Sequence, residues 1–170
     1  MAQGFLARVA GKTKQIFAII TSAGAGDSGK IPALDATGKL DSSFMPTGIA
    51  ANSVVAASSE NLASGDHVNL YDNGGVLTAR LADNSNNRPA FGYVTAAVTS
   101  PASATVFRLN TVNGSRTGLT AGASYWLGTA GGVISTPLDP VTDTGKTCQF
   151  LGIAKSTTEL VTVEEAPVLL

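Results

Sequence analysis

The chain has 170 residues, of which only 14% are charged, and its formal net charge at pH 7 is −1. This balance gives no indication of a nucleic acid or an anionic membrane as a partner. Its single cysteine, Cys148, excludes an internal disulfide and a cysteine-rich metal site, and the apolar string around it indicates a buried thiol.

Residues 1–50 form the first predicted unit, an extended N-terminal arm and linker. The apolar pattern of residues 4–21 fits either a strand pair or a short amphipathic helix, because periodicity does not separate the two. The segment has too many large apolar side chains for a solvated tail and no room for a core of its own. We therefore expect it to attach to a neighbouring chain or a larger assembly. The expected attachment residues are Phe5, Leu6, Ile16, Phe17, Ile19, Ile20, Leu34, Leu40, Phe44 and Met45.

Residues 24–30, GAGDSGK, match most of the phosphate-binding pattern G-x-x-x-x-G-K-[ST]. The residue after Lys30 is Ile31, which cannot ligate Mg²⁺, and Pro32 follows it. No helical pattern stands behind the loop, although phosphate binding depends on a helix N-terminus. We expect a flexible glycine hinge here, and neither a nucleotide nor another cofactor.

Residues 51–170 form the second predicted unit, and they contain an internal repeat. Residues 64–83 align with residues 121–140, so that GGVL at 74–77 falls on GGVI at 131–134. Further along the chain, AFGYV (90–94) falls on FLGIA (150–154), and ATVFR (104–108) falls on ELVTV (159–163). Each copy has the pattern of a strand, a turn, a second strand, a loop and two more strands.

The repeat predicts a mainly β fold, a small β-barrel or sandwich built from two pseudo-repeats with about eight strands. The steps Asn73-Gly74 and Ala130-Gly131 have the chemistry of hairpin turns. A domain of this size should enclose one modest core. The apolar C-terminus, residues 166–170, is expected to dock on a neighbouring chain.

The strand period predicts which side chains point inward. Val68 and Leu70 in the first copy, like Tyr125 and Leu127 in the second, should face the core. Trp126 lies on the other face, where a large aromatic side chain usually marks a contact. We therefore expect Trp126 at a subunit interface.

No catalytic or metal-binding residues are predicted. The only histidine, His67, follows Asp66, but neighbouring residues on a strand point to opposite faces, so the two cannot form a catalytic relay. We expect this histidine to be solvated or at an interface. The carboxylates are scattered, and no metal site is proposed. Three aromatic side chains that could stack on a sugar keep a glycan ligand open: Tyr71, Tyr93 and Trp126.

The segment KIPALDATGKLDSSFMPTGI (30–49) resembles a linker element of tailed-phage virion proteins, found in trimeric fibres and head decoration proteins. Residues 4–41 also resemble the N-terminal arm of phage head decoration (cement) proteins. Three later segments are similar to the small β-barrel of phage cement and head-fibre proteins: FGYVTAAV (91–98), GLTAGASYWLGTAGGVIST (118–136) and FLGIAKSTTELVTVE (150–164).

This resemblance implies a non-enzymatic homotrimer that decorates and stabilises the outside of a tailed-phage capsid. Residues 1–50 would bind the major capsid protein, and residues 51–170 would be the decoration domain. No signal peptide and no apolar run long enough to span a membrane are seen, so we expect assembly in the host cytoplasm and a final position on the outer surface of the phage head. Fibre proteins share the LDATGKLDSS element, and a trimeric fibre-type module that binds a host-surface glycan is the alternative.

Overall fold

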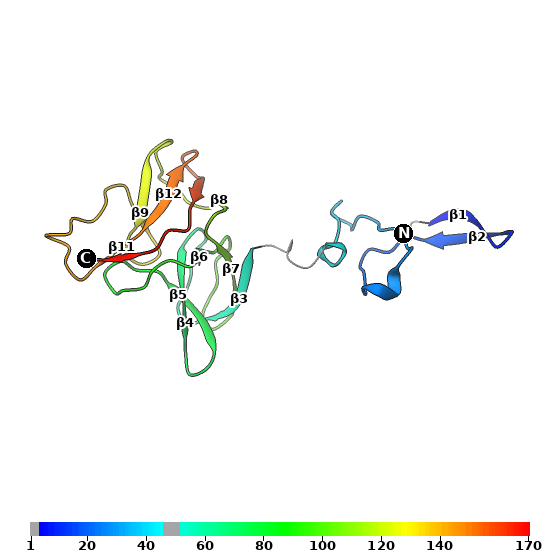
Figure 1. Ribbon diagram of the computed structural model, residues 1–170, viewed down its shortest axis with the longest axis horizontal. Coiled ribbons are helices and arrows are strands. Elements are labelled where there is room, and N and C mark those ends of the chain that lie inside the picture. Colours follow the sequence, from blue (N-terminus) through cyan, green and yellow to red (C-terminus); the bar gives the residue numbers. More distant parts are fainter. Residues whose placement is uncertain (1–3, 46–51) are drawn as a thin grey trace. The chain divides into compact units, whose positions relative to one another are not determined.

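The computed structural model describes residues 4–45 and 52–170, and the chain divides into two compact units, Met1–Ala51 and Asn52–Leu170 (Figure 1). The last part of the predicted linker, residues 46–50, lies outside the described residues. Strands make up most of the regular structure. The helical segments of the described residues are two short 3-10 turns, η1 (Ala25–Asp27) and η2 (Ser42–Phe44). The mainly β fold expected from the sequence is therefore confirmed.

The first unit begins with an antiparallel hairpin and not with an amphipathic helix. Strands β1 (Gly4–Val9) and β2 (Lys12–Phe17) pair along their whole length. Ala10 and Gly11 between them both have positive φ, as the tight two-residue turn of a hairpin requires. A two-stranded hairpin alone has too little surface to enclose a core. Its side chains therefore remain free to pack against a partner.

Five strands of the second unit close into a small barrel in the order β3-β5-β4-β6-β7. Strand β3 closes it by pairing in parallel with β5 and antiparallel with β7. Closure leaves no free strand edge, which removes a site for unwanted pairing. The barrel strands are β3 (Ser53–Ser58), β4 (His67–Asp72), β5 (Leu77–Leu81), β6 (Gly92–Tyr93) and β7 (Ser103–Arg108).

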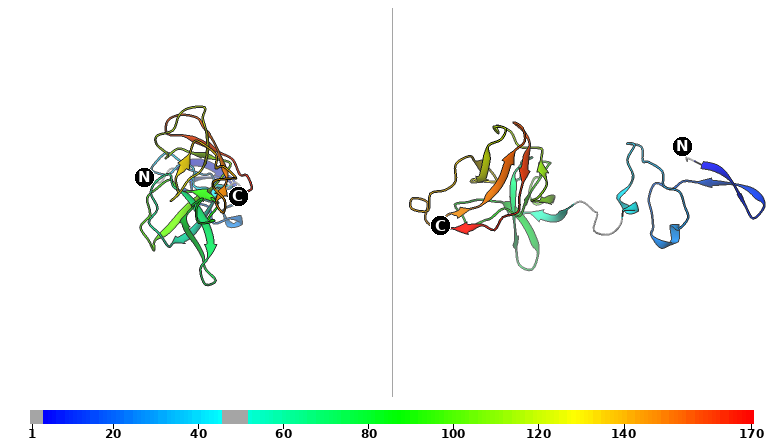
Figure 2. Two further views of the ribbon diagram at one scale, coloured as in Figure 1. Left: turned by 90° about the vertical axis from the view of Figure 1, so that its left-hand side faces the viewer. Right: turned by 45° about the horizontal axis from the view of Figure 1, so that its top comes forward.

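The following strands form an open antiparallel sheet in the order β10-β9-β12-β13-β8, shown with the barrel in Figure 2. The C-terminal strand β14 (Val168–Leu169) pairs with β11 (Thr147–Cys148). The backbone of the apolar C-terminus therefore pairs within its own unit, while the side chains of Val168 and Leu169, expected to dock on a neighbouring chain, stay exposed. The strands of the open sheet are β8 (Val112–Asn113), β9 (Ser124–Leu127), β10 (Val133–Ile134), β12 (Phe150–Ala154) and β13 (Leu160–Thr162).

The two sheets share one topology, as the internal repeat predicted. In each, the first hairpin strand (β4 or β9) lies between its hairpin partner (β5 or β10) and a third strand (β6 or β12), which pairs with a fourth (β7 or β13). The strand before each hairpin, β3 or β8, also pairs with the fourth strand. Because β3 has six residues and β8 only two, the first copy closes and the second stays open. With β11 and β14, the second unit has twelve strands instead of about eight.

One glycine in each copy fixes which residues are equivalent. A Cβ at Gly92 would lie 2.1 Å from the carbonyl oxygen of Phe107, and one at Gly152 would lie 1.9 Å from that of Val161. Each glycine therefore allows the third strand to approach the fourth closely. Phe107 is thus equivalent to Val161, and the sequence alignment of residues 104–108 with 159–163 was wrong by one residue. Such a slip places a side chain on the wrong face of the sheet.

The second unit has two buried apolar clusters, one of the barrel and one of the open sheet, where the sequence suggested a single core. Val68, Val94 and Val106 lie in the barrel cluster, and the partly buried Leu70 packs against it. The cluster of the open sheet contains Tyr125, Leu127, Leu151 and Leu160, together with Ala82, Ala90, Leu109, Leu119 and Ala154. The predicted inward orientation of Val68, Tyr125 and Leu127 is confirmed.

Candidate functional site

The ten predicted attachment residues of the first unit are not buried by the part of the chain that the structure describes. Ile16, Ile19 and Phe44 are half-buried. The other seven are exposed, from 39% for Phe5 to 72% for Leu6. These side chains therefore still have apolar surface that a partner could cover.

Both faces of the β1–β2 hairpin carry apolar side chains. Phe5 lies directly opposite Ile16 on one face, and Leu6 and Phe17 are diagonal neighbours on the other. Three cations lie nearer the turn, and among the ion pairs of the described residues none involves them: Arg8, Lys12 and Lys14. The hairpin thus combines an apolar open end with a basic tip.

The GAGDSGK segment belongs to a closed loop, and the prediction of a flexible hinge was wrong. The Ile19 N–H donates to the carbonyl of Ile31 at 3.0 Å, and the Ala33 N–H donates to that of Ile19 at 2.8 Å. Oxygen atoms of the loop accept five of its own backbone N–H groups, those of Ala23, Gly24, Asp27, Ser28 and Lys30. These groups are therefore not available to cradle a phosphate.

The Lys30 ammonium, which a nucleotide site would direct at phosphate, is bound inside the same loop. It lies 2.6 Å from the Asp27 carboxylate, and this contact, with the Ala23 N–H, lowers the pKa of Asp27. The structure therefore gives no support to nucleotide binding at this loop.

The linker element LDATGKLDSS is organised by two aspartates. The Asp35 carboxylate accepts hydrogen bonds from the backbone of Lys39 and from the backbone and hydroxyl of Thr37, and these bonds lower its pKa. Asp41 accepts from the Ser43 N–H at 2.9 Å, and the Ser43 hydroxyl accepts from Ser22 at 2.7 Å. The element therefore has a defined backbone and is tied to the closed loop.

Trp126 lies on the outer face of the open sheet, as its strand phase predicted. It is half-buried, and its ring is tilted against Phe150 with the centroids 5.4 Å apart. Its neighbours on β9, Tyr125 and Leu127, are buried on the other face. The site expected for a subunit contact is thus an aromatic pair and not a single side chain.

The other two candidates for sugar stacking are occupied by the chain itself. Tyr93 is only 3% exposed, and its hydroxyl lies 2.9 Å from that of Thr111 and 2.8 Å from the Val112 carbonyl. The guanidinium of Arg80 lies 4.1 Å from the centre of the Tyr71 ring. The buried Tyr93 ring therefore cannot stack on a sugar, and one face of the Tyr71 ring is covered.

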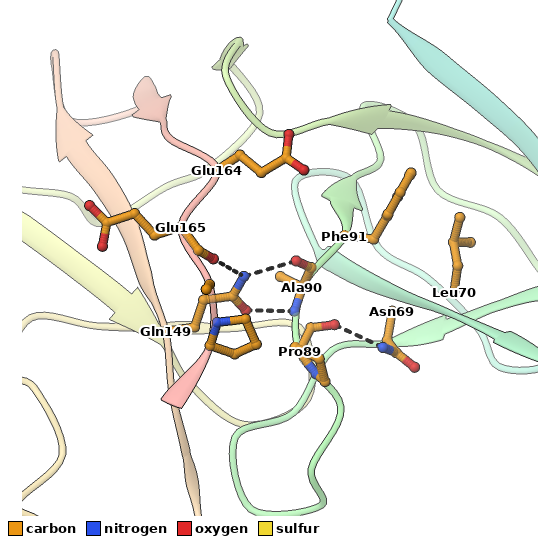
Figure 3. Close-up of a pocket in the computed structure, with 10 residues that line it drawn as sticks. Asn69, Leu70, Pro89, Ala90, Phe91, Gln149, Glu164 and Glu165 are labelled. Atoms are coloured by element: carbon orange, nitrogen blue, oxygen red, sulfur yellow. Dashed lines mark hydrogen bonds between the residues drawn. The ribbon is translucent and has the colours of Figure 1, made fainter. Parts of the chain in front are cut away.

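A pocket of about 470 Å³ lies where the C-terminal segment passes the barrel (Figure 3). Gln149 at its wall accepts the Ala90 N–H at 2.7 Å and donates to the Ala90 carbonyl at 3.0 Å. Arg108 lies over the Phe91 ring and pairs with Glu164 at 3.0 Å. These contacts connect the barrel to the C-terminal part of the chain, and they use polar groups that a ligand would otherwise meet.

His67 is buried, so the prediction of a solvated or interface histidine was wrong. It is 0% exposed, and neither ring nitrogen has a hydrogen-bond partner among the described residues. Burial, with the nearby charge of Arg116, lowers the pKa of His67 to about 3. Asp66 instead accepts the Ala63 N–H and lies 3.5 Å from Arg116. The side chains do not form a histidine–carboxylate relay.

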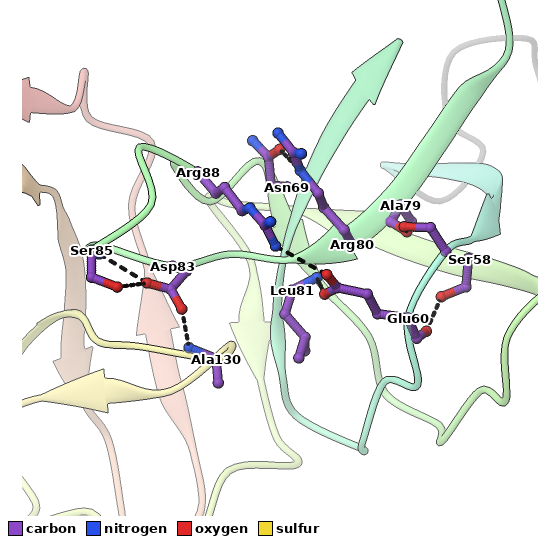
Figure 4. Close-up of polar contacts among 11 residues, drawn as sticks. Ser58, Glu60, Asn69, Ala79, Arg80, Leu81, Asp83, Ser85, Arg88 and Ala130 are labelled. Carbon is purple, nitrogen blue, oxygen red and sulfur yellow. Dashed lines mark hydrogen bonds and ion pairs between the residues drawn. The ribbon is translucent and has the colours of Figure 1, made fainter. Parts of the chain in front are cut away.

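His67 lies at the joint between the two copies. Its backbone N–H donates to the Gly131 carbonyl at 3.0 Å, and the Gly131 N–H donates to the Ala82 carbonyl at 2.7 Å. Asp83 accepts the N–H of Ala130 at 3.0 Å, and Glu60 joins Arg88 to the backbone of Leu81 (Figure 4). The hairpin turn of the second copy is thus fixed on the barrel.

Three further sequence expectations concern a metal site, a membrane span and the thiol. Across residues 4–45 and 52–170, no group of three or more His, Cys, Asp or Glu side chains is placed to hold a metal ion. No helix in the same residues is both long and apolar enough to cross a membrane. Cys148, expected to be buried, is half-buried.

Comparisons with known proteins give one fold likeness. No protein-family model and no curated protein matches the chain. Among solved structures, the chain is similar to the head fiber gp8.5 N base of bacteriophage phi29, with 14% sequence identity and a TM-score of 0.41. The match covers 66% of this chain and 98% of that one.

Proposed function

We propose that this chain is a non-enzymatic structural protein that decorates and stabilises the outside of a tailed-phage capsid as a homotrimer. The observation that carries the proposal is the first unit, whose ten predicted attachment residues all keep accessible surface. The resemblance of residues 4–49 to the arm and linker of phage decoration proteins supplies the class of partner. In this proposal the partner is the major capsid protein, and no nucleic acid, membrane or cofactor takes part.

The hairpin is the part of the arm that makes the first contact with the capsid. Its apolar open end loses water on docking, and burial of Leu6 and Phe17 would contribute about 1.5–3 kcal/mol for each side chain. Its three cations near the turn favour a capsid surface with acidic groups beside the apolar one. Because hydrogen bonds already order the loop and the linker, docking of the arm costs less conformational entropy than docking of a free tail would.

On one trimer, the binding of one arm strengthens the binding of the other two. When one arm has bound, the others act at a high effective concentration, which commonly raises affinity by about 10²–10⁴. The second unit has its own two apolar clusters. It can therefore stand on the outer surface of the head while the arm holds it there.

The alternative is a fibre-type module that binds a host-surface glycan. Of its three aromatic candidates, Tyr93 is buried, Tyr71 is partly covered by Arg80, and Trp126 is half-buried against Phe150. No contact among the described residues favours this alternative over attachment to the head.

The copy number of the chain in purified parent particles tests the proposal. Quantitative mass spectrometry against the major capsid protein should give a fixed stoichiometry comparable with the number of capsomers. An abundance matching the tail proteins instead would favour the fibre, and absence from the particle would refute both. A cryo-electron map of the same particles should place the first unit against the outer capsid surface.

A further inference from the structure

The second unit contains a pair of Asn-Gly steps that the fold places in opposite surroundings. Asn73-Gly74 lies in the turn between β4 and β5, and both residues are exposed. Among the described residues, neither the Asn73 side-chain amide nor the Gly74 N–H has a hydrogen-bond partner. The turn is held by its other groups, since the Asn73 N–H donates to the Val76 carbonyl at 2.9 Å and the Gly75 N–H donates to the Asp72 carboxylate at 2.7 Å. The Asn73 side chain is therefore free to turn towards the backbone that follows it.

At the other step, Asn113-Gly114, the asparagine side chain is buried and held. Asn113 ends β8 and is 0% exposed. Its Nδ2 donates to the Gly65 carbonyl at 3.0 Å, and its Oδ1 accepts the Ser115 N–H at 3.2 Å. The backbone of Asn113 also pairs with Leu160 in the open sheet. This side chain can leave its place only when the end of β8 opens.

We propose that Asn73 is a site of spontaneous deamidation in the folded chain and that the fold protects Asn113 from the same reaction. The Gly74 nitrogen loses its proton to solvent and attacks Cγ of Asn73. The new N–Cγ bond forms as the Cγ–Nδ2 bond breaks, and the amide nitrogen takes up a proton from solvent and leaves as ammonia. Glycine suits this attack because it has no Cβ to block the close approach.

Water completes the reaction at Asn73. It adds to either carbonyl of the cyclic succinimide and opens the ring, which gives aspartate from one carbonyl and isoaspartate from the other. Overall, one water is consumed and one ammonia is released, with no oxidant, reductant or enzyme. Asparagine is among the residues that limit the chemical lifetime of proteins at high temperature. The turn therefore carries a modification that accumulates with the age of the chain.

Deamidation changes the tip of the β4–β5 hairpin. It places a carboxylate beside Asp72 and adds one negative charge to a chain whose formal net charge is −1. The same tip exposes Val76 (57%) and Leu77 (50%), so a partly apolar surface becomes more acidic. Isoaspartate also lengthens the backbone of the turn by one atom. No residue of the turn belongs to the barrel cluster, so we expect the barrel to stay folded.

The experiment follows both Asn-Gly steps in the full wild-type chain, kept folded at mildly alkaline pH and physiological temperature. Chromatography and mass spectrometry of its peptides separate asparagine, aspartate and isoaspartate. Asn73 should convert at least about tenfold faster than Asn113, because reaction at the buried site waits for local opening. In concentrated urea the rates at the two steps should become comparable, since the protection of Asn113 comes from the fold.

Variants at the same position identify the new charge. Asn73→Gln keeps an amide on a longer side chain that would have to close a larger ring, so the folded variant should form far less of the acidic species on ion exchange. Asn73→Asp should elute with the acidic species of aged wild type. If Asn73 stays intact in the folded chain while it converts in urea, the inference is wrong. Equal rates at Asn73 and Asn113 in the folded chain would also overturn it.

Discussion

His67 makes a quantitative prediction about stability against pH. An unfolded chain binds a proton at this histidine near its ordinary pKa of 6.5, whereas the folded chain does so only at about 3. Between these values the unfolded state binds more protons, so the free energy of unfolding falls as the pH is lowered. The loss is at most about 1.4 kcal/mol for each pH unit below 6.5, which gives about 2 kcal/mol by pH 5. Above pH 6.5 the imidazole is neutral in both states, so burying it does not lower the free energy of unfolding through proton binding.

His67→Phe removes the titrating group and keeps a planar ring beside Tyr93. Urea unfolding at about pH 7.5 and about pH 5 should show wild type losing about 2 kcal/mol more than the variant. Any packing cost of the larger ring is the same at both pH values and cancels in this comparison. Since this is the only histidine, and carboxylates titrate mainly below this range, the difference isolates one residue. An equal loss in both proteins would show that the imidazole is not buried neutral at the joint.

The remaining predictions concern the backbone, the joint and the closed loop. Gly152→Ala should destabilise the chain by about 3 kcal/mol or more, because its Cβ would meet a carbonyl oxygen. The control Gly114→Ala, where a Cβ meets open space, should cost less than about 1 kcal/mol. Similar melting curves for the two variants would refute the close approach at Gly152. Gln149→Leu should cost about 2–4 kcal/mol in urea unfolding, since it leaves the N–H and carbonyl of Ala90 unpaired. Calorimetry should detect no MgATP binding by wild type or Lys30→Ala, and binding that the substitution abolishes would contradict the closed loop.

The hairpins and the repeat could be predicted because their signals are local. Turn glycines and alternating side chains indicated β4–β5 and β9–β10, and the order of the matched segments indicated one topology used twice. The strand period also placed Tyr125 and Leu127 inward correctly. These features depend on residues that are close together in the sequence.

The errors came from contacts between distant residues. The two-residue period of a strand showed that His67 and Val68 point to opposite faces. It could not show that the turn at Gly131 would cover the face on which His67 lies. In the same way, the glycines of residues 24–30 suggested freedom, while hydrogen bonds between Ile19 and Ile31 close the loop. The extent of β3 and β8, which decides which copy closes, also has no local signal.

Co-sedimentation with undecorated heads of the parent phage tests the central claim most directly. The variant is Leu6→Asp/Phe17→Asp in the full chain, and the control is Val141→Asp, an exposed apolar residue of the second unit. Losing two buried apolar contacts should cost about 3–6 kcal/mol for each arm, enough to abolish decoration at concentrations where the control saturates the heads. The account predicts a folded double variant that stays in the supernatant. A double variant that decorates heads at wild-type occupancy would contradict it.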